Sequence, residues 1–175
     1  WYVNTSYLGD KSTVQFNAFS GHEITYQAWN GVPADFLDDT ELRTFNSAGT
    51  EKPGDPHENE VDNYRQTHYQ LLWNSQLSSN LNFSLAGHYT KGAGYYEQYK
   101  AEEPLADYGL EGQLGLTSDL IRRRWLDNDF YGMTYSLQTV SSDGKLDFTF
   151  GGGIHFYEGR HFGEVIWARD FGEGE

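Results

Sequence analysis

The sequence has 175 residues, no cysteine and a formal net charge of −14. The missing cysteines exclude a disulfide framework and thiolate metal sites, and the acidity argues against a nucleic-acid partner, because phosphate backbones are bound by Lys and Arg. No run of about 18 apolar residues is present, which excludes a transmembrane helix, while an aromatic content of 17% favours strands.

Alternation of apolar and polar residues recurs along the chain and predicts about six long amphipathic strands. The first two cover residues 1–8 and 13–29, and Val14, Phe16 and Ala18 share one face of the second. Later strands are predicted over residues 65–77, 81–95, 125–140 and 145–157. Strands of globular proteins usually have about 5–6 residues, so these strands are unusually long.

The predicted connections alternate strictly between short and long. Gly9-Asp10, Ser78-Ser79 and residues 141–144 read as tight hairpin turns. Long connections are expected near residues 30–63, at residues 96–121 and after residue 158, with helical turns at residues 33–45 and 101–108. Such an order predicts an all-β, antiparallel up-and-down meander with its short turns at one end and its long loops at the other.

This asymmetry is typical of transmembrane β-barrels, and we expect the meander to be part of one. Apolar residues lie next to the short turns, and Tyr26, Tyr69, Tyr89 and Tyr131 lie farther along, as in an interfacial aromatic belt. The mean hydropathy of −0.71 is compatible with a barrel, because only alternate residues face lipid. An ordinary β-sheet with aromatic cross-strand pairs is the alternative.

Five segments resemble TonB-dependent outer-membrane receptors: FSGHEITYQAWNGVP (residues 19–33), EVDNYRQTHYQL (60–71), HYTKGAGYYEQYK (88–100), LIRRRWLDNDFYG (120–132) and HFGEVIWAR (161–169). The resemblance implies energy-coupled import of a siderophore for iron uptake, of haem or of another scarce nutrient, at the cell outer membrane. It implies a barrel of about 22 strands around a plug domain, with membrane lipid or lipopolysaccharide and the TonB complex as partners.

The sequence departs from this family because it contains neither a plug domain nor a TonB box. The chain also begins at Trp1 and ends shortly after Asp170 without clear terminal signals, so we expect a fragment of a larger receptor. No catalytic residue, cofactor or enzymatic activity is predicted. The alternative function is a soluble all-β binding or adhesion domain for a carbohydrate or protein ligand.

Two groups of side chains are candidates for binding. The ligand-binding candidates are Tyr95, Tyr96, Tyr99, Arg122 and Arg124, since Arg suits the carboxylate or phosphate groups of an anionic ligand. Alternation sends Arg123 to the face opposite Arg122 and Arg124. In the alternative interpretation, these residues pair with acids of neighbouring loops and stiffen the rim.

His68, His88 and His155 are predicted to face the lumen or the plug. No metal site is expected, because a strand would separate His155 from the other two. Asp127 and Asp129 share a strand face, but nothing places a sugar between them as in a glycosidase.

Overall fold

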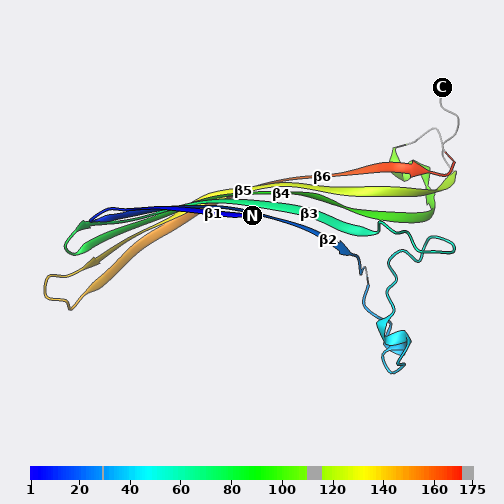
Figure 1. Ribbon diagram of the computed structural model, residues 1–175, viewed down its shortest axis with the longest axis horizontal. Coiled ribbons are helices and arrows are strands. Elements are labelled where there is room, and N and C mark those ends of the chain that lie inside the picture. Colours follow the sequence, from blue (N-terminus) through cyan, green and yellow to red (C-terminus); the bar gives the residue numbers. More distant parts are fainter. Residues whose placement is uncertain (29, 110–115, 171–175) are drawn as a thin grey trace. The chain divides into compact units, whose positions relative to one another are not determined.

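The computed structural model describes residues 1–28, 30–109 and 116–170. Six strands form one sheet in chain order, with antiparallel neighbours, which confirms the predicted all-β meander (Figure 1). They are β1 (Tyr2–Leu8), β2 (Ser12–Tyr26), β3 (Val61–Ser78), β4 (Leu81–Pro104), β5 (Thr117–Val140) and β6 (Asp147–Ala168). The sheet is not closed within these residues, so β1 and β6 are its two edges.

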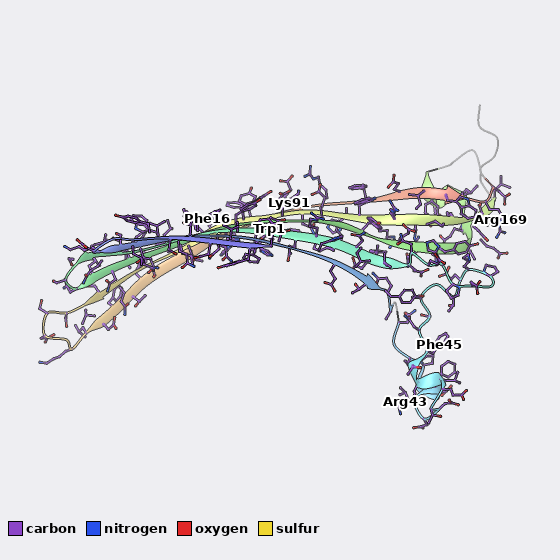
Figure 2. The ribbon with its side chains drawn as sticks, in the orientation of Figure 1. Trp1, Phe16, Arg43, Phe45, Lys91 and Arg169 are labelled. Atoms are coloured by element: carbon purple, nitrogen blue, oxygen red, sulfur yellow. The ribbon has the colours of Figure 1, made fainter. Side chains whose placement is uncertain are left out.

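The connections alternate as predicted. Residues 9–11, 79–80 and 141–146 are short, whereas residues 27–60 join β2 to β3 and contain the 3-10 helices η1 (Ala34–Phe36) and η2 (Leu42–Thr44). Figure 2 shows Arg43 and Phe45 on this connection. The helical turns predicted at residues 33–45 are thus confirmed as two separate 3-10 turns.

Three predicted boundaries were wrong, because the strands continue beyond them. β4 runs to Pro104 and β5 begins at Thr117, so most of the loop predicted at residues 96–121 is strand; residues 110–115 lie outside the described residues. Only residues 105–108 of the helical turn predicted at 101–108 are helical, as η3 (Leu105–Tyr108). β6 continues to Ala168, ten residues past the predicted start of a loop, and the predicted strand end at Trp29 is not described.

The chain divides into two compact units. The hairpin unit contains residues 1–22, 65–93 and 127–160, with all three short connections. The loop unit contains residues 23–64, 94–126 and 161–175, as far as they are described, with the long connections. Strands β2 to β6 each contribute residues to both units.

The hairpin unit is a single layer of sheet with chemically different faces. β1 and β2 pair with Tyr2 opposite Phe19 and Leu8 opposite Thr13. One face, called the apolar face, is formed in β3 to β6 by alternate residues of segments 69–77, 81–89, 131–139 and 148–156. Its exposed large side chains include Leu71, Trp73, Met133, Phe150 and Ile154.

The opposite, polar face of the hairpin unit is held by hydrogen bonds between amides and hydroxyls. Asn17 is buried, and its Oδ1 accepts from Tyr2 Oη at 3.2 Å, Asn4 Nδ2 at 2.6 Å and Gln15 Nε2 at 3.1 Å. Its Nδ2 donates to Gln70 Oε1 at 3.3 Å. These four bonds satisfy a side chain that would otherwise be costly to bury.

The buried apolar side chains among the described residues are few. Ala18 lies in the hairpin unit, and Ala48, Tyr99, Leu105 and Leu120 lie in the loop unit. The hairpin unit therefore has almost no core of its own, and no described residues form a second layer on its apolar face. No helix within the described part of the chain has the length and apolar character needed to cross a membrane.

Candidate functional site

The five predicted ligand-binding residues divide between the two sides of the sheet in the loop unit. Arg124 Nη1 donates to Tyr96 Oη at 3.1 Å, and Arg122 on the same side bonds Gln98. Tyr95 instead lies beneath the Arg123 guanidinium, 4.3 Å from ring centroid to Cζ. The structure therefore brings Tyr96, Arg122 and Arg124 together on one side, called the Tyr96 side, and separates Tyr95 from them.

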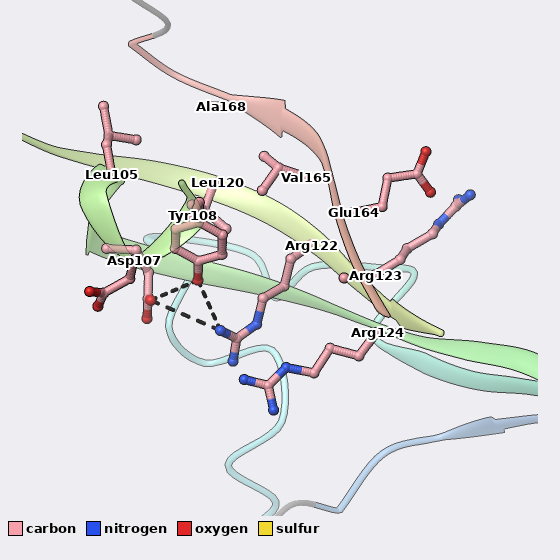
Figure 3. Close-up of a pocket in the computed structure, with 12 residues that line it drawn as sticks. Leu105, Asp107, Tyr108, Leu120, Arg122, Arg123, Arg124, Glu164, Val165 and Ala168 are labelled. Atoms are coloured by element: carbon pink, nitrogen blue, oxygen red, sulfur yellow. Dashed lines mark hydrogen bonds and ion pairs between the residues drawn. The ribbon is translucent and has the colours of Figure 1, made fainter. Parts of the chain in front are cut away.

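A pocket of about 570 Å³ opens on the Tyr96 side, beside Arg122 and Arg124 (Figure 3). The 3-10 helix η3 supplies Leu105 and Tyr108 to its lining, and β6 supplies Gly163 and Val165. Gly163 bears no side chain, which leaves room beside the guanidinium groups. The lining is strongly charged, because the acids Glu103, Asp107 and Glu164 line the pocket together with the three arginines of β5.

Arg122 is fixed within this pocket by neighbouring polar groups. Its Nε and Nη2 donate to Gln98 Oε1 at 3.1 and 2.9 Å, and Nη1 donates to Tyr108 Oη at 2.9 Å. Tyr108 Oη donates in turn to Glu103 Oε2 at 2.8 Å. Burial raises the pKa of Tyr108, and this hydrogen bond raises it further. Arg122 is therefore preorganised, but the carboxylate of Glu103 lies only 4.0 Å away.

Arg124 has a different environment, because its side chain is exposed. Its contacts are with Tyr96, through the hydrogen bond and through a ring centroid 5.9 Å from Cζ. Among the described residues, no carboxylate lies within 4.0 Å of its guanidinium. Arg124 therefore retains donors that could bind a carboxylate or phosphate in a bidentate manner.

Arg123 and Glu97 form an ion pair on the other side of the strands. Arg123 Nε lies 2.8 Å from Glu97 Oε2, and His57 Nε2 lies 2.8 Å from Oε1. Burial raises the pKa of Glu97, but hydrogen bonds from Arg123, His57 and Asn59 outweigh it and lower the pKa overall. The pairing of Arg123 with Glu97 agrees with the alternative interpretation, in which the arginines pair with acids. Through His57, Glu97 also connects the long connection at residues 27–60 to β4.

Tyr99 belongs to a second buried cluster and does not line the pocket. Its hydroxyl and the Arg169 guanidinium both donate to Asp119 Oδ2, and the Glu102 amide donates to Oδ1 at 3.0 Å. Glu102 has φ +52°, a left-handed conformation that directs its amide toward the carboxylate. The hydrogen bond from Tyr99 contributes most to the lowered pKa of Asp119.

The sequence reasoning did not single out Glu97 or Asp119. Both are acids within strands that it read as acidic loop, and their burial, at 3% and 4% exposure, marks them as structural anchors. An acid positioned opposite an arginine of a neighbouring strand was the available signal, as for Glu97 and Arg123.

The three predicted histidines lie in the hairpin unit. His68 stacks on Phe19 with ring centroids 4.5 Å apart, and its nitrogens bond Thr90 at 3.0 Å and Gln66 at 3.1 Å. A strand does separate His88 from His155, as expected, but His88 Nε2 and His155 Nδ1 are 3.0 Å apart, so the inference that His155 lies too far away for shared ligation was wrong. The intervening strand β5 carries Gly132 at this position, which has no side chain to hold the rings apart.

The carboxylates of Asp127 and Asp129 are both engaged by cations. Lys91 Nζ bonds Asp127 and lies 2.8 Å from Asp129, and Arg160 lies 3.3 and 3.6 Å from the two acids. Tyr89 Oη also donates to Asp129 at 2.5 Å. This arrangement is a compact ion-pair cluster, and it leaves no open cleft between the two carboxylates.

Within residues 1–28, 30–109 and 116–170, no group of three or more His, Cys, Asp or Glu side chains is arranged to hold a metal ion. Comparison with protein-family models, with curated proteins and with solved structures gives no significant match to this chain. The functional argument therefore depends on the two faces of the hairpin unit and on the pocket of the loop unit.

Proposed function

We propose that the chain forms six adjacent strands of the wall of a transmembrane β-barrel in the cell outer membrane. The barrel is of the TonB-dependent receptor class and imports a siderophore, haem or another scarce nutrient. The observation that carries the membrane part of the proposal is the exposed apolar face of the hairpin unit. An exposed apolar face of this kind must be shielded from water. Its length along each strand fits the hydrocarbon layer of a membrane.

The apolar face has the same length on four neighbouring strands. It occupies residues 69–77, 81–89, 131–139 and 148–156, which is nine residues on each of β3 to β6. A transmembrane β-strand needs about 9–11 residues. Nine residues span about 30 Å of strand, or about 23 Å of membrane at a tilt near 40°, close to the apolar band of about 25 Å found on outer-membrane barrels.

The band ends at the same row of residues on all four strands. Tyr69 and Tyr89 lie with ring centroids 6.2 Å apart, and Tyr131 and Phe156 with centroids 5.5 Å apart. Directly beyond this row the same face becomes charged, with the cluster of Lys91, Asp127, Asp129 and Arg160. Aromatic rings followed by charges are expected where hydrocarbon gives way to lipid headgroups. Tyr26, also predicted for this belt, lies in the loop unit and donates to Ala48 O at 2.8 Å.

The opposite face suits a water-filled lumen. It carries the hydrogen-bonded cluster around Asn17 and the histidines His68, His88 and His155. Outer-membrane barrels alternate apolar residues toward lipid with polar residues toward the interior.

The two open edges support the view that these strands are part of a larger sheet. An unpaired edge exposes backbone N–H and C=O groups, which cannot be left unbonded in hydrocarbon. The barrel must therefore be closed by further strands that pair with β1 and β6. Six strands are about a quarter of a 22-stranded transporter barrel.

The resemblance of five segments to TonB-dependent receptors supports the import function. The exposed guanidinium of Arg124 beside a pocket of about 570 Å³ supports an anionic ligand, as many siderophore complexes are. We assign ligand contact to Tyr96, Arg122 and Arg124, and structural support of the rim to Tyr95 and Tyr99.

Single-cysteine labelling tests the membrane part, because an introduced cysteine would be the only one within residues 1–175. Nitroxide labels at Leu71 and Met133 should be accessible to oxygen dissolved in lipid and protected from a water-soluble nickel chelate, in the full-length gene product in lipid vesicles. Labels at the adjacent Gln70 and Thr134 should behave in the opposite way. Greater accessibility of residues 71 and 133 to the chelate would refute the membrane wall and favour a binding domain in water.

A deletion strain tests the import part separately. It should grow poorly on one defined siderophore or haem as sole iron source, and the wild-type gene should restore growth. Normal growth on every iron and nutrient source tried would contradict import while leaving the labelling result intact.

A further inference from the structure

His88 and His155 are hydrogen-bonded to each other, through one ring nitrogen each, on the polar face of the hairpin unit. The nitrogens are 3.0 Å apart, and the ring centroids are 5.2 Å apart at an interplanar angle of 30°. The residues come from β4 and β6, which are not neighbours in the sheet. Phe130 of β5 packs against both rings, at 4.8 Å from His88 and 5.9 Å from His155, and limits their movement.

Gly132 is the residue that permits this approach. A Cβ atom built on Gly132 would lie 2.7 Å from His155 Nδ1 and 2.3 Å from the Ile154 carbonyl oxygen. Real Cβ atoms do not come so close to other heavy atoms, so any larger residue would displace the His155 ring. The convergence of the two imidazoles therefore depends on a glycine in the strand between them.

The 3.0 Å between the nitrogens is a hydrogen-bond distance, and it also allows both nitrogens to bind one metal ion. With metal–nitrogen bonds of about 2.0–2.1 Å, two ligands at 90° are about 2.9 Å apart, and two ligands at the tetrahedral angle are about 3.3–3.4 Å apart. The observed 3.0 Å is closer to the first value. Cis ligands at 90° are characteristic of tetragonal Cu(II) and Ni(II) sites, for which imidazole is a suitable ligand.

We propose that His88 and His155 form a two-imidazole binding site for Cu(II) or Ni(II), with His88 Nε2 and His155 Nδ1 as the ligands. No third histidine or acid of the described chain is placed to join them, so water or a small ligand completes the coordination. Without a metal, one imidazole donates its N–H to the other. When the metal binds, this proton moves to the other nitrogen of the same ring, so no proton is released. The net charge of −14 favours the approach of a cation.

His68 lies on the same face and provides a matched control. Both of its ring nitrogens already bond neighbouring side chains, Thr90 Oγ1 and Gln66 Oε1, and no other imidazole converges on it. A single histidine of this kind should bind Cu(II) only weakly, because the second imidazole of a chelating pair acts as an intramolecular ligand. The inference does not rest on the proposed membrane function.

Copper titration of the full-length gene product in detergent, at neutral pH with glycine as a competitor, tests the site. The wild type and His68→Asn should bind one equivalent of Cu(II) with equal affinity, and electron paramagnetic resonance should show two equivalent nitrogen ligands. His88→Asn and His155→Asn should each weaken binding at least about tenfold. Gly132→Ala, which keeps both histidines, should weaken it as well.

Equal copper affinity in the wild type, His88→Asn and His155→Asn would overturn the proposal. So would a two-nitrogen spectrum that persists without His155. If Gly132→Ala loses its native circular dichroism, the two histidine variants still decide the question, because both replace exposed or half-exposed polar side chains.

Discussion

Replacement of Leu85 by arginine gives a direct measure of what covers the apolar face. Leu85 is the central residue of the segment 81–89 on β4, and a barrel in a bilayer would hold it near the midplane. Arginine on the lipid face of a transmembrane barrel costs about 2–4 kcal/mol at the midplane and about 0–1 kcal/mol near the interface. We therefore expect Leu85→Arg to destabilise the barrel by about 3 kcal/mol and Tyr89→Arg by less than about 1 kcal/mol.

The adjacent Ala86 provides the matched control. It is half-buried like Leu85, lies one residue farther along the same strand, and points to the polar face. In the proposed barrel, Ala86→Arg would introduce the same charge at the same depth but on the lumen side, where lipid is absent. Its effect should be close to that of an ordinary surface substitution, within about 0.5 kcal/mol.

Denaturant unfolding of the full-length gene product in lipid vesicles, followed by tryptophan fluorescence, measures these differences. With a denaturant dependence of about 2 kcal/mol per molar, a loss of 3 kcal/mol lowers the midpoint by about 1.5 M. The reasoning fails if Leu85→Arg and Ala86→Arg shift the midpoint equally. It also fails if Leu85→Arg causes no loss, since a leucine facing water is replaced by a charge at little cost.

Three further predictions concern the loop unit and its neighbouring strands. Gly94→Ala would bring a Cβ within 2.2 Å of a β3 carbonyl oxygen and should lower stability by about 1–3 kcal/mol in denaturant titrations, whereas Gly87→Ala on the same strand meets nothing within 4 Å and should not. Asp119→Asn weakens the acceptor for Tyr99, so amide exchange around residues 101–108 should accelerate. Because folding lowers the pKa of Glu97, its carboxylate stabilises the folded loop unit at pH values above the ordinary pKa of 4.5. This stabilisation is lost as the pH falls through the lower pKa of the folded state. Glu97→Gln should therefore flatten the dependence of the unfolding midpoint on acid pH.

Hydrophobic alternation predicted the strands where one face is apolar and missed strand segments where the alternation breaks down, as in residues 97–104 and 159–168. Residues 97–104 contain glutamates, a lysine and a glutamine, and their acidity suggested a loop. In the structure, such residues are held in strand by pairing across the sheet, as between Glu97 and Arg123 at 2.8 Å. A pattern based on burial has no signal for this kind of strand.

The alternation of side chains between the two faces of a strand also explains which site predictions agree with the structure. Alternation correctly separated Arg123 from Arg122 and Arg124. Applied equally to Tyr95 and Tyr96, which are adjacent in one strand, it would have separated these two as well. The histidine pair was missed because the strand between the two histidines was expected to keep their rings apart. That strand carries Gly132 at this position, which has no side chain.

As a single-layer sheet in water, the hairpin unit would leave its apolar face uncovered. A stable sheet needs a second layer against its apolar face, and Ala18 is the unit's buried apolar residue among those described. A protein layer would cover this face but would not require the band to begin and end at the same rows on four strands. It would also not require a row of charges directly beyond the aromatic residues Tyr89 and Phe156. A bilayer requires both features, because its hydrocarbon thickness is fixed and its headgroups are charged.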